Sequence, residues 1–221
     1  MITIVGAGPG PAEYMTPEAS SAIADSRVVA GGARVLNAVR LPRSARRVEL
    51  PASGMADAVV PILENESRIS DVTLIVSGDP GFYSLAKKVI SHFGRKNVTV
   101  IPGISSLQLM ASRICRSWVG VASDTLHGRD IPDMSGLAVK LRASPALAVL
   151  FGASEEVAGH IGRMARDDEL GAARAALGWD LGLPEERIFE ASCLSGLEGA
   201  EHKGRLALLW LEKKGGVGDA G

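Results

Sequence analysis

The stretch Val76-Ser77-Gly78-Asp79-Pro80-Gly81-Phe82-Tyr83 decides the fold, because in it an apolar run ends in a turn of small residues. Similar turns follow two other apolar runs, at Gly6-Ala7-Gly8-Pro9-Gly10 and at Pro102-Gly103-Ile104-Ser105-Ser106. In an open α/β sheet, ligands bind beyond the carboxyl ends of the strands. Three such loops therefore predict one small-molecule site at that edge of a sheet.

The first half of the chain alternates between short apolar runs and helical patterns. Val72, Leu74, Ile75 and Val76 form the nearly continuous apolar run expected of a strand covered on both faces. Pro61 falls within one helical pattern and predicts a kink or a late start there. Strands are expected at 2–5, 27–30, 48–50, 71–77 and 98–101, and helices at 16–26, 55–67, 82–93 and from 105 onward. This order predicts an α/β domain with a parallel sheet and right-handed crossovers.

The second half reads differently and predicts a second, mixed α+β domain. Its strand candidates are 119–122, 147–151, 188–191 and 206–211, and only 154–166 has a convincing helical pattern. The predicted domains are therefore 1–117 and 118–214. The glycine-rich segment 215–221 is expected to be a disordered tail.

Composition excludes several functional classes. The 221 residues are 46% hydrophobic and 22% charged, with a formal net charge of -1, which disfavours a nucleic-acid partner. Cys115 and Cys193 are far apart and have no CxxC spacing, as in a protein of the reducing cytosol. The chain shows neither a signal-peptide pattern nor an apolar run of membrane-spanning length, so a soluble cytoplasmic protein is predicted. The histidines lack ligand spacing, and no metal site is predicted.

Each loop alone is weak evidence for a ligand. The stretch 6–10 superficially resembles a dinucleotide fingerprint, in which glycines let the backbone approach a pyrophosphate at a helix N-terminus. Here Pro9 and Pro11 interrupt the loop and the helix begins only near Thr16, which argues against NAD. Taken singly, this loop and 78–81 read equally well as ordinary turns.

Taken together, the three loops, with Tyr14-Met15-Thr16 after the first and Tyr83 after the second, resemble the tetrapyrrole (corrin and porphyrin) methylase family over nearly the whole chain. Three further stretches resemble the branch of that family that methylates carbon C5 of precorrin-7 in cobalamin biosynthesis. They are 28–36, His127-Gly128-Arg129 and 183–188, and the His-Gly-Arg sequence discriminates best.

The resemblance implies two α/β domains with S-adenosylmethionine in the cleft between them, in a homodimer. Two interpretations of Asp79 are weighted equally. It is either a contact of the cofactor or a structural brace whose carboxylate accepts hydrogen bonds from backbone N–H groups of its own loop. By position in the family, the cofactor contacts would be Pro9 beside the substrate trough, Gly78, Asp79 and Phe82, then Ile104, Ser105 and Ser106 around the methionine part, and Leu150 and Phe151 over the adenosine.

The substrate implied by the resemblance is a corrinoid, a large apolar ring with carboxylates at its edge. Arginine suits such carboxylates, and Arg34 and Arg129 are the candidates, with His127 as a carboxylate ligand, a proton carrier or a structural brace. The cluster Arg40, Arg43, Arg46 and Arg47 is expected to be a solvated surface. Methyl transfer needs no nucleophilic side chain, so no catalytic residue is assigned.

Further implications and alternatives follow from the family. The methyltransferase and decarboxylase that acts at C15 would be a separate subunit. The alternatives are another enzyme of the same fold, such as a methylase of a different corrin position, a siroheme-type methylase, diphthine synthase or an RNA ribose methylase. A non-catalytic nucleotide-binding subunit is the alternative from a different class.

Overall fold

The chain folds into two compact units. The computed structural model describes residues 1–126, 134–152, 157–197, 200 and 206–213. Its contacts divide the chain into Met1–Ser106 and Leu107–Gly221, earlier than the expected boundary at 117. Helix α5 (Ser106–Arg113) explains the difference, because Arg113 Nε donates to Glu186 Oε1 of the second unit at 2.7 Å. The tail predicted at 215–221 lies outside the described residues.

A five-stranded parallel sheet forms the centre of the first unit, as predicted. Its order is β3-β2-β4-β1-β5, and every neighbouring pair is parallel. From β1 the chain passes β4 to reach β2, whereas from β4 it passes β1 to reach β5. These two connections run in opposite directions across the sheet, so the neighbouring strands β1 and β4 form its topological switch point. The strands are β1 (Ile2–Gly6), β2 (Val28–Gly32), β3 (Arg46–Leu50), β4 (Val72–Val76) and β5 (Val98–Ile101).

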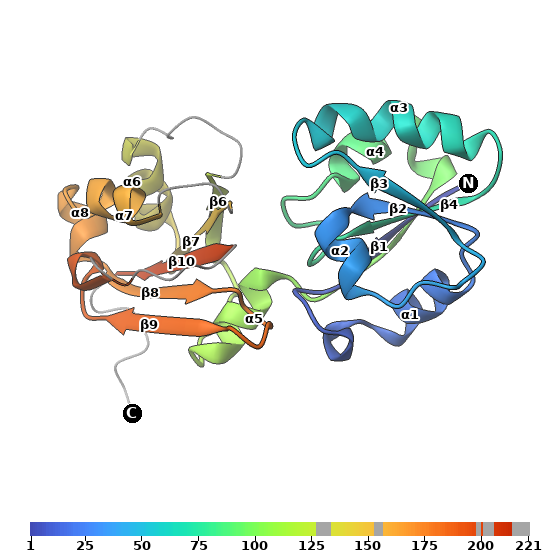
Figure 1. Ribbon diagram of the computed structural model, residues 1–221. Coiled ribbons are helices and arrows are strands. Elements are labelled where there is room, and N and C mark those ends of the chain that lie inside the picture. Colours follow the sequence, from blue (N-terminus) through green and yellow to red (C-terminus); the bar gives the residue numbers. More distant parts are fainter. Residues whose placement is uncertain (127–133, 153–156, 198–199, 201–205, 214–221) are drawn as a thin grey trace. The chain divides into compact units, whose positions relative to one another are not determined.

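Helices cover both faces of this sheet (Figure 1). On one face Leu74 packs with residues of α3 (Met55–Ser67) and α4 (Ala86–Phe93). On the other face Ile75 packs with residues of α1 (Pro17–Ala24) and α2 (Ala33–Ala38). Because neighbouring residues of β4 are buried on opposite faces, the strand is apolar at every position except Thr73, whose Oγ1 forms a hydrogen bond with Ser26 Oγ at 2.6 Å.

Local sequence explains where the helices of this unit begin. The N-cap of α1 is Thr16, whose Oγ1 accepts the N–H of Ala19 at 3.1 Å, as its sequence predicts. Helix α3 begins at Met55 and runs through Pro61. The predicted start of a helix at 82 is wrong, because Tyr83 has a φ of 46° and α4 begins only at Ala86.

The second unit contains a mixed sheet. Its order is β6-β7-β10-β8-β9, and only β6 and β7 are parallel. The predicted strand at 119–122 is wrong in position, because residues 118–121 form a turn in which the N–H of Val121 donates to the carbonyl of Trp118. The strands are β6 (Ala122–Thr125), β7 (Ala146–Phe151), β8 (Arg174–Trp179), β9 (Arg187–Ala191) and β10 (Ala207–Glu212).

Three helices share the core of this unit with alternate residues of the sheet. They are α6 (Met134–Ala143), α7 (Val157–Met164) and α8 (Asp168–Ala172), of which the sequence predicted only α7. The structure also contains short 3-10 helices at Ala12–Tyr14, Arg95–Asn97 and Leu194–Leu197.

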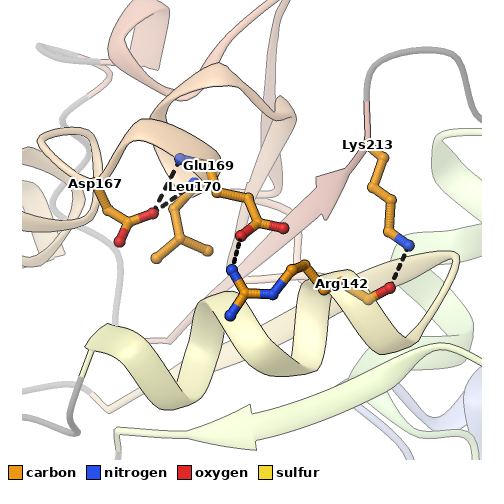
Figure 2. Close-up of polar contacts among 5 residues, drawn as sticks. All are labelled: Arg142, Asp167, Glu169, Leu170 and Lys213. Carbon is orange, nitrogen blue, oxygen red and sulfur yellow. Dashed lines mark hydrogen bonds and ion pairs between the residues drawn. The ribbon is translucent and has the colours of Figure 1, made fainter.

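Polar contacts fasten α6 and α8 to each other and to the end of β10 (Figure 2). Asp167 Oδ1 caps α8 by accepting the N–H groups of Glu169 and Leu170, each at 3.0 Å. Arg142 of α6 forms an ion pair with Glu169. Lys213 Nζ, just after β10, donates to the carbonyl of Arg142.

Candidate functional site

The loops after β1 and β4 are joined by backbone hydrogen bonds. The N–H of Ala7 donates to the carbonyl of Val76 at 2.9 Å. Beyond the strands, Gly8 and Gly78 form an antiparallel bridge, with bonds of 3.2 and 2.8 Å in the two directions. The first two predicted loops are therefore in direct contact.

The side chain of Asp79 joins the second loop to the third. Its Oδ1 accepts the N–H of Gly81 at 2.7 Å, and its Oδ2 accepts the N–H of Gly103 at 3.0 Å. The backbone carbonyl of Asp79 also accepts the N–H of Phe82 at 3.1 Å. Asp79 therefore braces both its own loop and the loop after β5.

Glycine allows the three loops to pack backbone against backbone. A Cβ on Gly103 would lie 2.4 Å from the carbonyl oxygen of Gly78 and 2.9 Å from the carbonyl group of Gly6. A Cβ on Gly6 would lie 2.7 Å from the nitrogen of Gly103 and from the oxygen of Gly78. Real Cβ atoms do not approach other atoms so closely, so a side chain at either position would force the loops apart.

The remaining predicted residues of the loops line the same edge of the sheet. A Cβ on Gly78 would face Ser105 Cα at 3.8 Å and the carbonyl oxygen of Ile104 at 3.9 Å. Ser105 is 5% exposed and Pro9 is also buried, whereas Ile104, Ser106 and Phe82 are half-buried. The ring of Phe82 meets the exposed ring of Tyr83 edge-on at 4.9 Å.

The first loop presents no helix N-terminus, as expected. Pro11 precedes a single 3-10 turn at Ala12–Tyr14, and α1 begins only at Pro17. A phosphate at Gly6 to Gly10 would therefore lack the aligned N–H groups of a helix start.

Arg34 places a positive charge at the end of β4, on the side of that strand that faces away from β1. It lies in α2, directly after β2, and its Nη2 donates to Ser77 Oγ at 2.9 Å. Because β2 and β1 flank β4 on opposite sides, Arg34 adjoins the second loop on the side away from the first. The four arginines predicted to be solvated, at 40, 43, 46 and 47, are all exposed. Two of these are paired, Arg46 with Glu66 and Arg47 with Glu49.

The other predicted residues lie elsewhere in the chain. Leu150 and Phe151 end β7 in the second unit. Phe151 is 2% exposed, and its ring packs 5.7 Å from the ring of His160, so its side chain belongs to the core. Leu150 is half-buried and pairs with Leu208 of β10. The predicted substrate residues His127 and Arg129 fall outside the described residues.

Sequence reasoning did not assign roles to Ser77, Gly6 and Gly103. Each of them is the last residue of a strand or lies within two residues of a strand end. This position at the carboxyl edge of the sheet is the signal in the sequence that could have identified them. What the sequence did not reveal is which strand ends are neighbours, and that determines the partner of each residue.

Within the described residues, no His, Cys, Asp and Glu side chains gather in a group of three or more that could hold a metal ion. None of the helices in those residues is both long and apolar enough to span a membrane.

Comparison with known proteins identifies several relatives. A protein of Methanocaldococcus jannaschii named as a probable cobalt-precorrin-7 C(5)-methyltransferase is 30% identical over 132 residues, which are 59% of this chain and 62% of that protein. The cobalt-precorrin-7 C(5)-methyltransferase of Salmonella typhimurium is 32% identical over 136 residues, 58% of this chain and 62% of that protein. The matched segments thus span somewhat less than two thirds of these relatives. Methyltransferases named for position C(17) also match.

Solved structures share the fold along nearly the whole chain. The precorrin-6Y methylase of Archaeoglobus fulgidus superposes with a TM-score of 0.74 at 24% identity, covering 97% of this chain and 98% of that one. The uroporphyrin-III C-methyltransferase of Thermus thermophilus in complex with S-adenosylhomocysteine gives a TM-score of 0.69 at 22% identity, covering 95% and 96%.

The family is shown by a match that is longer than the alignments to the two relatives from Methanocaldococcus jannaschii and Salmonella typhimurium. Residues 1–193 match the family described as Tetrapyrrole (Corrin/Porphyrin) Methylases, and this range includes all three loops. The resemblance inferred from those loops is confirmed, and the chain belongs to the tetrapyrrole (corrin/porphyrin) methylases.

Proposed function

We propose that this chain is an S-adenosylmethionine-dependent C-methyltransferase of cobalamin biosynthesis that methylates C5 of precorrin-7 or its cobalt form. The names of the first two matched relatives support the position on the ring. The relatives named for C(17) match at similar identity over shorter segments, and they define the main competing specificity.

The packing of the three loops is the observation that carries the proposal. An adenosyl sulfonium needs backbone polar groups, small residues that allow close approach, and no nearby mobile cation. The loops offer Gly6, Gly78 and Gly103 in backbone contact, and their one charged residue, Asp79, is negative. The residues present therefore fit the methyl donor, and they do not fit a pyrophosphate.

The chemistry of the donor sets what the protein has to do. When bound, S-adenosylmethionine supplies an electrophilic methyl group, which forms a bond to the ring carbon while its bond to sulfur breaks, leaving S-adenosylhomocysteine. The ring would then lose one proton to a nearby base or water. The loops would fix the donor by Gly78, Ile104 and Ser105, while Pro9 would border the ring. Phe82 would also contact the donor, and Ser106 would pack around its methionine part. Such positioning can supply much of a rate enhancement without a nucleophilic side chain.

Arg34 is the described residue best placed to bind the substrate. Its guanidinium already donates to Ser77 Oγ at the end of β4, so it is held at the carboxyl edge of the sheet. A carboxylate of the corrinoid would form a charge-assisted pair with this guanidinium. We include His127 and Arg129 in the substrate site on the basis of the family resemblance.

On the basis of the family resemblance, we also include Leu150 and Phe151 among the contacts of the adenosine. The Phe151 ring is buried in the core, so only its backbone would take part. The assembly would be a homodimer acting in the cytoplasm, with the reaction at C15 carried out by a separate subunit.

Transfer of tritium from methyl-labelled S-adenosylmethionine to a panel of purified precorrins tests this function. We expect label in precorrin-7 or cobalt-precorrin-7, with the methyl group located at C5 by NMR, and inhibition by added S-adenosylhomocysteine. Labelling of a precursor of the C17 methylation step instead would replace the proposed specificity. Binding of S-adenosylhomocysteine without transfer to any tetrapyrrole would favour the non-catalytic subunit.

A further inference from the structure

We propose that Asp79 is a positioning residue, whose carboxylate latches the loop after β5 to the loop after β4 and thereby sets the affinity for the methyl donor without contacting it. The inference rests on the proposed function, because it assumes that these loops hold S-adenosylmethionine. Of the two roles that the sequence left open for Asp79, this is the structural brace.

The geometry of the carboxylate supports this role. Its two oxygens point to backbone donors on different loops, Oδ1 to Gly81 at 2.7 Å and Oδ2 to Gly103 at 3.0 Å. Hydrogen bonds from backbone N–H groups to an ionised carboxylate are stronger than bonds between neutral groups. Asp79 therefore ties together two segments that are 24 positions apart in sequence.

The hydrogen bond from Gly103 to Asp79 holds the start of the loop after β5. Pro102 follows β5 directly and has no N–H group, so Gly103 carries the first backbone donor that the loop offers. Gly103 also packs against the carbonyl of Gly78, and no side chain separates the two. The Asp79 bond thus fixes the point from which Ile104 and Ser105 begin, and these residues face Gly78.

The latch predicts a definite order for the effects of substitutions at Asp79, according to how many of the two hydrogen bonds each variant keeps. Asparagine has the same shape but a single acceptor oxygen, so Asp79→Asn retains at most one of the two bonds. Asp79→Ala loses both bonds. A residue that only contacted the ligand would show no such dependence in the free protein, where no ligand is present.

Two measurements on the full chain test the proposal. Calorimetry with S-adenosylhomocysteine gives the affinity, and NMR amide exchange of Gly103 in the ligand-free protein reports the latch. We expect the dissociation constant to rise about 5- to 150-fold in Asp79→Ala and by less in Asp79→Asn. The Gly103 amide should exchange faster in the same order. Asp57→Asn is the matched control, since Asp57 is an exposed carboxylate on α3, paired with Lys88.

The possible outcomes distinguish a failure of the proposed latch from a failure of the proposed function. Wild-type protein that does not bind S-adenosylhomocysteine would refute the proposed function, and the inference with it. If wild type binds, weakened binding in the variants with an unchanged Gly103 exchange rate would mean that Asp79 touches the ligand. Faster exchange with unchanged affinity would mean that the loop does not hold the ligand. An unprotected Gly103 amide in the wild type would refute the latch without any variant.

Discussion

Gly8 and Gly78 exchange two backbone hydrogen bonds in an antiparallel bridge, although the strands that precede them, β1 and β4, run parallel. The chain direction must therefore reverse locally beyond the strands. Both glycines of the bridge have a positive φ, 72° at Gly8 and 68° at Gly78, a conformation that residues with a side chain rarely adopt.

Replacing Gly8 by alanine should disrupt both the loop and the site. The new Cβ would lie 2.8 Å from the carbonyl oxygen of Tyr14, and the positive φ adds strain. We expect a loss of about 2 to 4 kcal/mol in the free energy of unfolding, measured with urea, and loss of S-adenosylhomocysteine binding.

Gly54→Ala is the matched control for that variant. Gly54 has a similar φ of 67°, but a Cβ there meets nothing within 4 Å. It should cost only about 1 kcal/mol, from the backbone conformation alone, and leave binding intact. Equal losses in the two variants would show that the close contact with Tyr14 contributes nothing.

Arg34→Met should weaken binding of the corrinoid and spare binding of the methyl donor. The substitution keeps an unbranched side chain and removes the charge-assisted bond that a substrate carboxylate would receive. We expect the KM for the corrinoid to rise about 10- to 100-fold in steady-state assays, with the dissociation constant of S-adenosylhomocysteine within about twofold of wild type.

Arg47→Met provides the comparison for Arg34. Arg47 lies on the edge strand β3 and pairs with the exposed Glu49 at 3.0 Å. Because exposed ion pairs contribute little, this variant should behave as wild type in both measurements. An unchanged KM in Arg34→Met would remove Arg34 from the substrate site.

Asp167→Ala should destabilise the second unit. The variant removes the acceptor of the N–H groups of Glu169 and Leu170 at the start of α8 (Figure 2). The expected loss is about 1 kcal/mol in the free energy of unfolding, typical of a lost N-cap. Asp168→Ala removes a neighbouring acid that makes no cap and should cost less. A smaller effect for Asp167→Ala than for Asp168→Ala would contradict the capping role.

The Asp57–Lys88 pair predicts a defined pH response. Lys88 Nζ donates to Asp57 Oδ1 at 2.8 Å, and this bond, together with the lysine charge, lowers the pKa of the Asp57 carboxyl below its usual range. A lowered carboxyl pKa stabilises the folded state at pH values above the unfolded pKa, and that contribution disappears as the pH falls through the folded pKa. Lys88→Met should therefore raise the Asp57 pKa in an NMR titration. No change would show that the pair does not persist in solution.

Apolar pattern and turn chemistry were sufficient to predict most of the first unit. The run at Val72 to Val76 predicted a strand buried on both faces, and Thr16 with Pro17 predicted the start of α1. Strand β8 could not be found in this way, because Arg174–Trp179 contains two alanines and a glycine, which have low strand propensity. Its place between β10 and β9 is fixed by hydrogen bonding to both neighbours.

The site was predictable in its parts but not in its connections. Each loop was recognisable because it follows an apolar strand. The bond from Gly103 to Asp79 depends on β1 lying between β4 and β5, and the bond from Arg34 to Ser77 depends on β2 lying next to β4. Strand order is a property of the whole sheet, and no local stretch of sequence encodes it.

The contact between Gly6, Gly78 and Gly103 also limits how the protein can be engineered. With no room for a side chain at Gly6 or Gly103, variation at either position would damage the shared framework before it altered selectivity. Libraries aimed at a new tetrapyrrole should therefore leave these positions fixed and diversify α2 around Arg34, where the side chain stands outside the glycine contact.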